Sequence, residues 1–180
     1  MNKYLHMHER WMAEALALAE KALKAGEFPV GCVLVGEGGI IARGSRMNSS
    51  GKLQNELDHA EMVALRNWFD AGRPGGEITC YSTLEPCLMC TGALIISGVK
   101  RIVFAYEDVM GGACGMEFRG PFSVSGKNMA ERCLYNSAEV EIIGGVLRKE
   151  SIRLFKSFFS SPKNHYLKNT LLERYTLQEV

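Results

Sequence analysis

The amino-acid sequence predicts a single α/β domain, and two patterns carry that prediction. Apolar runs at residues 30–35 and 40–43 flank the glycine-rich turn 36–39, which is typical of an antiparallel hairpin. Two further apolar runs, at residues 78–82 and 102–106, lie on either side of a helical segment, and a strand, a helix and a strand of this length form a parallel, right-handed crossover. With 180 residues, 47% of them hydrophobic, the chain can fill one core but is too short for two comfortable domains.

Helical spacing and helix-ending residues define the other elements in the first part of the chain. Apolar residues recur at helical spacing over residues 9–25, and the glycine that follows can end this amphipathic helix. The polar, irregular stretch 47–58 predicts a loop that faces a pocket. A second helix is expected over residues 59–71 and a third over residues 86–97. The crossover places the start of the third helix at the carboxyl edge of the sheet, where open α/β folds bind ligands.

The second part of the chain is expected to complete the sheet and to add a helical tail. A short helix near residues 128–135, a strand near 140–143 and a helix over 148–159 fit the apolar pattern. A serine-serine-proline sequence then breaks the last helix. We therefore divide the chain into a domain of residues 1–160 and a tail of residues 161–180, which could cover a pocket or contact a partner.

Composition and charge exclude several classes of function. Lys and Arg number 21 against 20 Asp and Glu, so no overall charge excess points to nucleic acid. No apolar run approaches the length of a membrane span, and the N-terminal residues are too polar for a signal peptide. We therefore expect a cytoplasmic protein with no membrane partner, whose six cysteines bind metal or lie in the core instead of forming disulfides.

Two short motifs contain residue types that bind zinc. Cys87 and Cys90 are three residues apart after Pro86, so both sulfurs are expected on one face of the first turn of a helix. The partial positive charge at a helix N-terminus favours the thiolate, which is the form of cysteine that binds metal. His59 is the candidate for a third ligand. By itself, the cysteine pair could equally be redox-active or half of a structural site.

The number of ligands separates a catalytic zinc from a structural one. A structural zinc usually has four protein ligands, whereas a catalytic zinc has three and keeps a position for water, whose pKa it lowers. Glu61, two residues after His59, is placed to move a proton at such a site. Two other interpretations stay open. Asp58 and Glu61 could form a capping box at a helix start, and Cys114 or Cys133 could complete a structural site.

Together and in this order, the two motifs match the signature of zinc deaminases, in which His-x-Glu precedes Pro-Cys-x-x-Cys. The sequence resembles the cytidine deaminase-like superfamily, and within it the branch of tRNA adenosine deaminases and of guanine and cytosine deaminases. The resemblance implies a three-layer α/β/α domain with a five-stranded mixed sheet, one zinc ion per chain and usually a homodimer. It runs from about Trp11 to Met116 and includes residues 27–31, 59–65, 83–90, 103–104 and 112–115.

The resemblance also implies roles for individual residues. His59, Cys87 and Cys90 would hold the zinc ion, and Glu61 would relay protons while the carbon that bears an exocyclic amine is attacked. Substrate contacts would come from an asparagine in the loop after the hairpin, from the segment before the hairpin and from the two helix starts. For these contacts we predict Asn48, Ala60, Pro29, Val30 and Pro86. Asn55 is a rival for the asparagine, because the hairpin looks longer than usual.

Departures from the tRNA-acting pattern leave three hypotheses open. Glu56 and Asp58 add two acids to the approach to His59, where an RNA strand would pass, and acids oppose phosphate binding. We therefore favour deamination of a small nucleobase, nucleoside or related heterocycle, for which an aromatic tail containing Tyr166 and Tyr175 could act as a lid. A tRNA adenosine deaminase is the first alternative. A non-catalytic zinc or RNA-binding module is the second.

Overall fold

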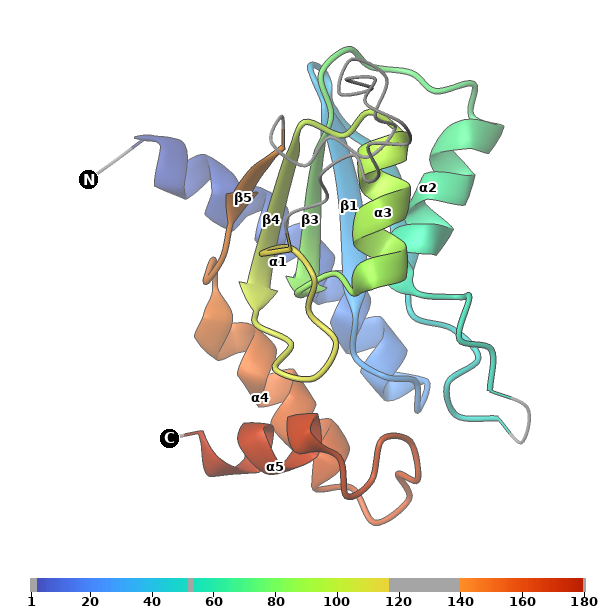
Figure 1. The fold of residues 1–180 in the computed structure, drawn as a ribbon, viewed down its shortest axis with the longest axis vertical. Coiled ribbons are helices and arrows are strands. Elements are labelled where there is room, and N and C mark those ends of the chain that lie inside the picture. The colour runs from blue at the N-terminus through green and yellow to red at the C-terminus, as the bar shows by residue number, and fades with distance from the viewer. Residues whose placement is uncertain (1–2, 52–53, 117–139, 180) are drawn as a thin grey trace, which may run out of the picture.

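A computed structural model describes residues 3–51, 54–116 and 140–179 and shows an α/β fold (Figure 1). The hairpin, the two crossover strands and the helix over residues 148–159 lie where the sequence predicts them. In chain order the elements of the described part are α1 (Lys3–Lys24), β1 (Gly31–Gly36), β2 (Gly39–Ser45), α2 (Ala60–Asp70), β3 (Thr79–Leu84), α3 (Leu88–Ile96), β4 (Arg101–Tyr106), β5 (Glu141–Ile143), α4 (Arg148–Phe159) and α5 (Leu171–Gln178).

The five strands form one mixed sheet in the order β2-β1-β3-β4-β5. β1 pairs antiparallel with β2 and β3, whereas β4 pairs parallel with β3 and β5. α2 and α3 lie side by side on one face of the sheet, and α1 packs on the other face, where it also contacts α4 (Figure 1). The predicted three-layer α/β/α fold is therefore confirmed. Both α2 and α3 start at the edge where β3 and β4 end.

α2 packs very close to β2, because Gly44 places no side chain between them. A Cβ atom at Gly44 would lie 2.1 Å from the carbonyl oxygen of Ala60 and 2.5 Å from the amide nitrogen of Ala64. Only glycine allows this approach, because the atoms that would clash belong to the backbone. The contact fixes the first turn of α2, and with it His59, against the strand.

Gly44→Ala should lower the free energy of unfolding by about 1–3 kcal/mol, the usual cost of forcing an extra methyl group into a packed core. Urea unfolding followed by circular dichroism measures the difference. Gly38→Ala is the matched control, because a Cβ atom at Gly38 meets no heavy atom within 4 Å. Equal stability of the two variants would show that α2 moves away from β2 without cost.

A charged cluster around Arg148 ties α5 to the rest of the domain. The Arg148 guanidinium donates to both carboxylate oxygens of Glu107 and, at 3.0 Å, to Glu179. The Tyr175 hydroxyl of α5 donates to Glu107 at 2.7 Å. Glu107 directly follows β4, so the cluster joins the tail to the end of a central strand. The division of the chain at residue 160 stays a prediction.

The Glu107 carboxylate should make stability depend on pH. The Arg148 guanidinium lowers the pKa of Glu107 from 4.5 to about 2. A carboxyl whose folded pKa is depressed stabilises the fold above its unfolded pKa, and this contribution is lost as the pH falls toward the folded value. Glu107→Gln should therefore be less stable than the wild type near neutral pH, and the difference should shrink between about pH 4.5 and pH 2. A difference that stays constant in urea titrations across this range would contradict the assignment.

Four predictions about elements need correction or fall outside the described residues. α1 starts at Lys3, six residues earlier than the predicted residue 9. α2 starts one residue later than predicted and α3 two residues later, because His59 and Cys87 are extended N-cap residues with ψ angles of 151° and 174°. The predicted helix at residues 128–135 and Cys133 lie outside the described residues. Across the described ranges, no helix combines the length and the apolar character needed to cross a membrane.

Candidate active site

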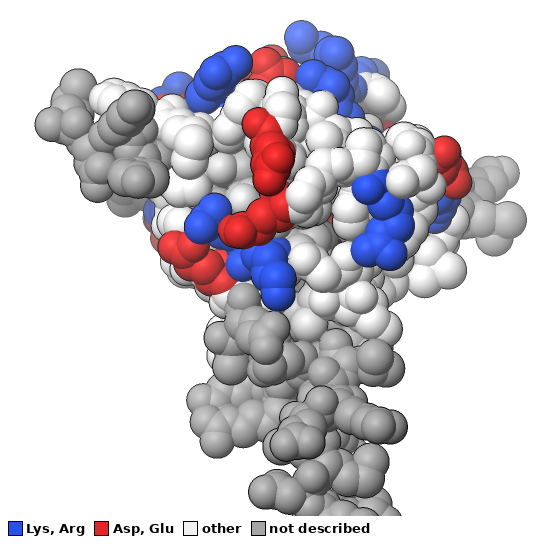
Figure 2. Space-filling view, turned by 90° about the horizontal axis from the view of Figure 1, so that it is seen from above, with Lys and Arg blue, Asp and Glu red and all other residues white. Residues whose placement is uncertain are grey.

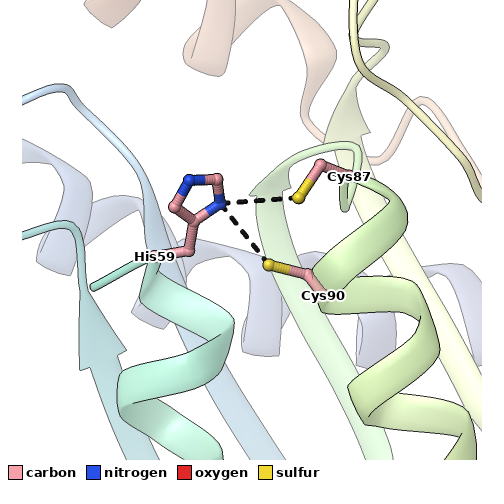
Figure 3. A group of neighbouring side chains, drawn as sticks. All are labelled: His59, Cys87 and Cys90. Atoms are coloured by element: carbon pink, nitrogen blue, oxygen red, sulfur yellow. Dashed lines mark hydrogen bonds between the residues drawn. The ribbon is translucent and has the colours of Figure 1, made fainter. Parts of the chain in front are cut away.

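Two helix N-termini bring the predicted metal ligands together at the carboxyl edge of the sheet. His59 and Cys87 are the N-cap residues of α2 and α3, and Cys90 lies in the first turn of α3. Neither N-cap side chain caps its own helix. The imidazole and the sulfurs therefore point toward one another across the space between the two helices (Figure 3). We call these three side chains the His-Cys-Cys group.

The two nitrogen–sulfur separations within the His-Cys-Cys group match the edges of a zinc tetrahedron. Nδ1 of His59 lies 3.6 Å from the sulfur of Cys87 and 3.5 Å from the sulfur of Cys90. All three ligand atoms lie within 4.8 Å of one another. Zn–N bonds of about 2.0–2.1 Å and Zn–S bonds of about 2.3 Å, at tetrahedral angles, give a nitrogen–sulfur separation of about 3.5–3.6 Å. The group therefore fits a zinc ion.

Cys114 lies nearby but does not join the His-Cys-Cys group. Its sulfur is 3.8 Å from the hydroxyl oxygen of Thr91, and its backbone N–H donates to Glu85 at 3.1 Å. Within the described ranges, only the His-Cys-Cys group brings three metal-binding side chains together. This part of the chain thus offers three ligands, the number typical of a catalytic zinc. The other proposed fourth ligand, Cys133, lies outside the described residues.

Without metal, the two cysteines differ in charge. The neighbouring Cys90 thiol and the His59 ring lower the pKa of Cys87 to about 4, so this cysteine is a thiolate at neutral pH. The contact with Cys87 and burial raise the pKa of Cys90 well above its usual range. The Cys87 thiolate also raises the pKa of His59. Because metal binding must displace these protons, zinc affinity should fall as the pH decreases.

Glu61 lies buried beside the group and does not cap α2. Its side chain is 3% exposed, the Ser82 hydroxyl donates to Oε1 at 2.6 Å, and the Cys90 thiol donates to Oε2 at 3.4 Å. Burial raises the pKa of Glu61, and the hydrogen bond from Ser82 opposes this effect. Since His59 is the N-cap and makes no side-chain capping bond, the capping-box interpretation of Asp58 and Glu61 is wrong. A buried carboxyl with a raised pKa beside metal-binding side chains has the setting of a proton-transfer group.

A cavity of about 210 Å³ opens beside the His-Cys-Cys group. It is smaller than the roughly 300–1,000 Å³ of sites for drug-sized ligands, so its size suits a single heterocycle. The residues that line it come from the segments before and after the hairpin, from the end of β3, from the starts of α2 and α3, from the loop after β4 and from the tail. They are Phe28, Val30, Arg46, Glu56, His59, Ala60, Glu61, Leu84, Glu85, Cys87, Asp108, Met110, Gly111, Tyr166, Leu167 and Leu172.

Only two of the five residues that we predict to contact the substrate line this cavity. Val30 and Ala60 line it, whereas Pro29, Asn48 and Pro86 do not. The side-chain amides of Asn48 and Asn55 both donate to Oδ2 of Asp58, each at 2.7 Å, so both asparagines hold the loop together. Asn48 also has a left-handed backbone, with φ of 57°, as asparagine tolerates in turns. The substrate-binding roles of all five residues stay predictions.

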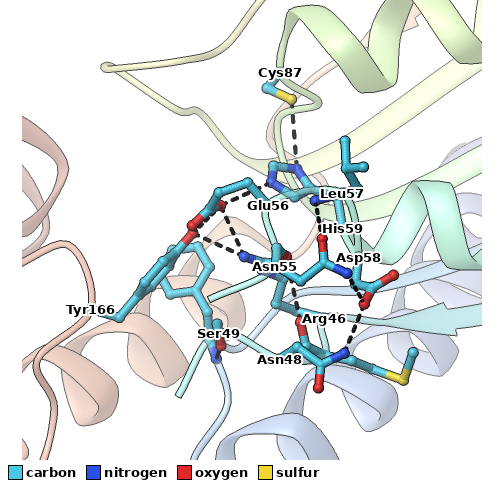
Figure 4. Close-up of polar contacts among 12 residues, drawn as sticks. Arg46, Asn48, Ser49, Asn55, Glu56, Leu57, Asp58, His59, Cys87 and Tyr166 are labelled. Atoms are coloured by element: carbon cyan, nitrogen blue, oxygen red, sulfur yellow. Dashed lines mark hydrogen bonds and ion pairs between the residues drawn. The ribbon is translucent and has the colours of Figure 1, made fainter. Parts of the chain in front are cut away.

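Sequence reasoning missed Arg46, which lines the cavity where the chain leaves β2. Its side chain is 2% exposed and lies beside Tyr166 of the tail. Arg46, Glu56 and Tyr166 come together next to His59 (Figure 4). The sequence holds only a weak signal for Arg46, which is a charged residue directly after an apolar hairpin strand. The predicted lid residue Tyr166, by contrast, does line the cavity of its own chain.

Known proteins with similar sequences and structures are deaminases. Residues 5–106 match the cytidine and deoxycytidylate deaminase zinc-binding region. A tRNA-specific adenosine deaminase of Bacillus subtilis is 35% identical over 158 residues, which cover 84% of this chain and 88% of that protein. A solved tRNA:A34 deaminase shares 26% identity with a TM-score of 0.59, covering 81% of this chain and 98% of that one. The diaminohydroxyphosphoribosylaminopyrimidine deaminase/reductase of Thermotoga maritima shares 32% identity with a TM-score of 0.60, covering 84% of this chain and 40% of that one.

Proposed function

The chain belongs to the cytidine and deoxycytidylate deaminase zinc-binding family, and from this we propose that it hydrolyses the exocyclic amine of a small nucleobase, nucleoside or related heterocycle. The family makes the protein a zinc-dependent deaminase. The small substrate is our own proposal. In the reaction, water replaces a C–NH₂ group by a carbonyl group and ammonia leaves.

Within this proposal, His59, Cys87 and Cys90 hold the zinc ion. A zinc ion with three protein ligands supplies a water that is deprotonated near neutral pH. Glu61 takes up the proton on its carboxylate and passes it to the departing amine, which leaves as ammonia. The hydrogen bond from Ser82 to Oε1 orients the Glu61 carboxylate, so that Oε2 faces the His-Cys-Cys group.

The tail is the observation that supports a small substrate. Tyr166, Leu167 and Leu172 line the same cavity as His59 and Glu61. A substrate bound beside the zinc site would therefore be covered by the chain's own C-terminal segment. A single heterocycle fits under such a cover, whereas a nucleotide within a folded RNA would need the tail to move.

Charge at the cavity also supports an uncharged substrate. The cavity is lined by one cationic residue, Arg46, and by four acidic residues, which are Glu56, Glu61, Glu85 and Asp108. The charge of a zinc ion would be balanced by its two thiolate ligands. Phosphate groups would therefore meet a net negative charge, which disfavours phosphorylated substrates.

Ammonia release from matched substrates tests this proposal. The zinc-loaded protein should release ammonia from at least one of cytosine, guanine, adenine, cytidine, guanosine and adenosine, and faster than from an unmodified tRNA at equal concentration. Activity confined to the tRNA would overturn the small-substrate proposal. No release from any of these compounds would overturn the proposed nucleobase and nucleoside substrates altogether.

A tRNA adenosine deaminase is the second candidate, because the relative from Bacillus subtilis carries that name at 35% identity. RNA-binding proteins usually gather Lys and Arg on one face. Figure 2 looks onto the end of the sheet opposite the cavity and shows basic and acidic side chains scattered among uncharged ones over the described residues. In the described part of this face, Figure 2 therefore shows no gathered basic patch, and inosine formation in the tRNA of the same assay would support this candidate.

The homodimer and the cytoplasmic location also belong to this proposal. Leu88 and Ile96 of α3 are 54% and 49% exposed, and with Gly92 between them they follow one another at four-residue spacing on one helix face. A second copy could cover these two exposed apolar side chains, which supports the proposed homodimer. Sedimentation velocity should give twice the mass of the chain, and a monomer at micromolar concentration would exclude the dimer.

A further inference from the structure

Glu56 lies on the side of the His59 ring that faces away from the cysteines. Its Oε2 is 3.7 Å from Nε2 of His59, whereas Nδ1 of the same ring faces the two sulfurs at 3.5 and 3.6 Å. If Nδ1 binds metal it carries no hydrogen, so the ring hydrogen is on Nε2 and faces the carboxylate. At 3.7 Å the contact lies within ion-pair range and is longer than an ordinary hydrogen bond of about 2.7–3.2 Å.

The Glu56 carboxylate is held in place although its side chain is 57% exposed. Arg46 Nη2 and the Tyr166 hydroxyl each donate to Oε2 at 2.9 Å (Figure 4). Arg46 is itself fixed, because Nη1 donates to the carbonyl oxygens of Met47 at 3.2 Å and of Asn55 at 2.6 Å. Nη2 also donates to the Tyr166 hydroxyl at 3.2 Å. Four N–H groups of Arg46 thus hold the loop, the tail and Glu56 in one arrangement.

The Glu56 oxygen that makes these contacts indicates that Glu56 does more than neutralise the charge of Arg46. If Glu56 only neutralised the buried Arg46, either carboxylate oxygen would serve. Instead, the contacts from Arg46, Tyr166 and His59 all converge on Oε2, and no partner of Oε1 is found among the described residues. The carboxylate is therefore turned so that one oxygen faces His59.

We propose that Glu56 is a positioning residue that accepts the Nε2 hydrogen of His59 and so keeps Nδ1 directed at the two sulfurs. Tyr166 holds Glu56 in this position and thereby couples the tail to the metal centre. The inference rests on the proposed role of His59 as a zinc ligand. Carboxylates that orient a metal-binding histidine typically contribute about 10–100-fold to metal affinity.

Zinc affinity, measured by competition with a chelator and without any substrate, tests the inference. Glu56→Ala should weaken zinc binding by about 10–100-fold. Glu56→Gln keeps an acceptor oxygen but no charge, so its loss should be smaller. Glu20→Ala is the matched control, since Glu20 is an exposed acid of α1 that does not line the cavity. Zinc affinity of Glu56→Ala within about twofold of the control would overturn the inference.

A double-mutant cycle tests the part played by Tyr166. Tyr166→Phe should weaken zinc binding in the wild type and have no further effect in Glu56→Ala, because Tyr166 acts through Glu56. Additive losses would overturn the coupling. Urea unfolding of the zinc-free variants separates an effect on metal binding from an effect on fold stability. If Glu56→Ala fails to fold, the zinc affinities of Glu56→Gln and Tyr166→Phe decide whether the inference holds. Since no substrate is used, failure of this test and failure of the deaminase assay are distinguishable.

Discussion

Glu61→Gln is expected to lower kcat by about 10²–10⁴-fold while each chain still binds one zinc ion. Glutamine keeps the size of the side chain and an oxygen that can accept the Ser82 hydrogen bond, but it cannot take up a proton. Glu61 is 3% exposed and lies next to the His-Cys-Cys group without belonging to it, so the metal should stay. Ammonia release with the substrate found in the panel gives kcat, and mass spectrometry of the metal gives zinc per chain.

The control for this variant removes the same charge elsewhere. Glu20→Gln changes an exposed acid of α1 and should leave both kcat and zinc content unchanged. If Glu61→Gln turned over substrate at the rate of the control, Glu61 would not be the proton-transfer group. If Glu61→Gln lost its zinc, the carboxylate would belong to the metal site, and the assignment of three ligands would be wrong.

Cys87→Ala is expected to lose stoichiometric zinc and, with it, all measurable deamination. The variant removes the thiolate with the lowest pKa of the group, held near 4 by Cys90 and His59, and leaves two ligands where three are needed. The folded protein should also lose the stability that bound zinc provides, because metal that binds only the folded state stabilises it. Zinc content after dialysis and the change in Tm on adding zinc measure both effects.

Cys114→Ala is the matched control for Cys87→Ala. Cys114 is a buried cysteine near the site, but its sulfur contacts Thr91 and lies outside the His-Cys-Cys group. Its removal should leave zinc content unchanged. Loss of zinc in Cys114→Ala would support the structural-zinc hypothesis, and retention of one zinc ion per chain in Cys87→Ala would show that another residue is the ligand.

The sequence predicted most of the fold because its patterns are local. The hairpin, the crossover and α4 each have a clear hydrophobic period bounded by glycine, proline or serine, so their positions were correct within a few residues. The starts of α2 and α3 were wrong by one or two residues, because an N-cap residue such as His59 or Cys87 has an extended backbone that residue type alone does not reveal. The five-stranded mixed sheet came from the family resemblance.

The His-Cys-Cys group could be predicted because metal ligands have characteristic types and spacing. The rest of the cavity wall could not, since it depends on contacts between segments far apart in the chain. Arg46 and Tyr166 are separated by 120 positions and meet only in the folded structure. Asn48 stood at a plausible distance in sequence from His59, yet its amide binds Asp58. Loop geometry of this kind follows from hydrogen bonds that no periodic pattern records.

The position of Tyr166 has a consequence for how such an enzyme could diversify. The sheet and the helix starts carry the His-Cys-Cys group, whereas one wall of the cavity belongs to the last segment of the chain. Because that wall lies outside the elements that carry the His-Cys-Cys group, replacing it by a segment that keeps a tyrosine at position 166 would remodel the binding surface while the contact to Glu56 stays in place. Chimeras joined after α4 that retain Tyr166 are thus a direct route to altered selectivity.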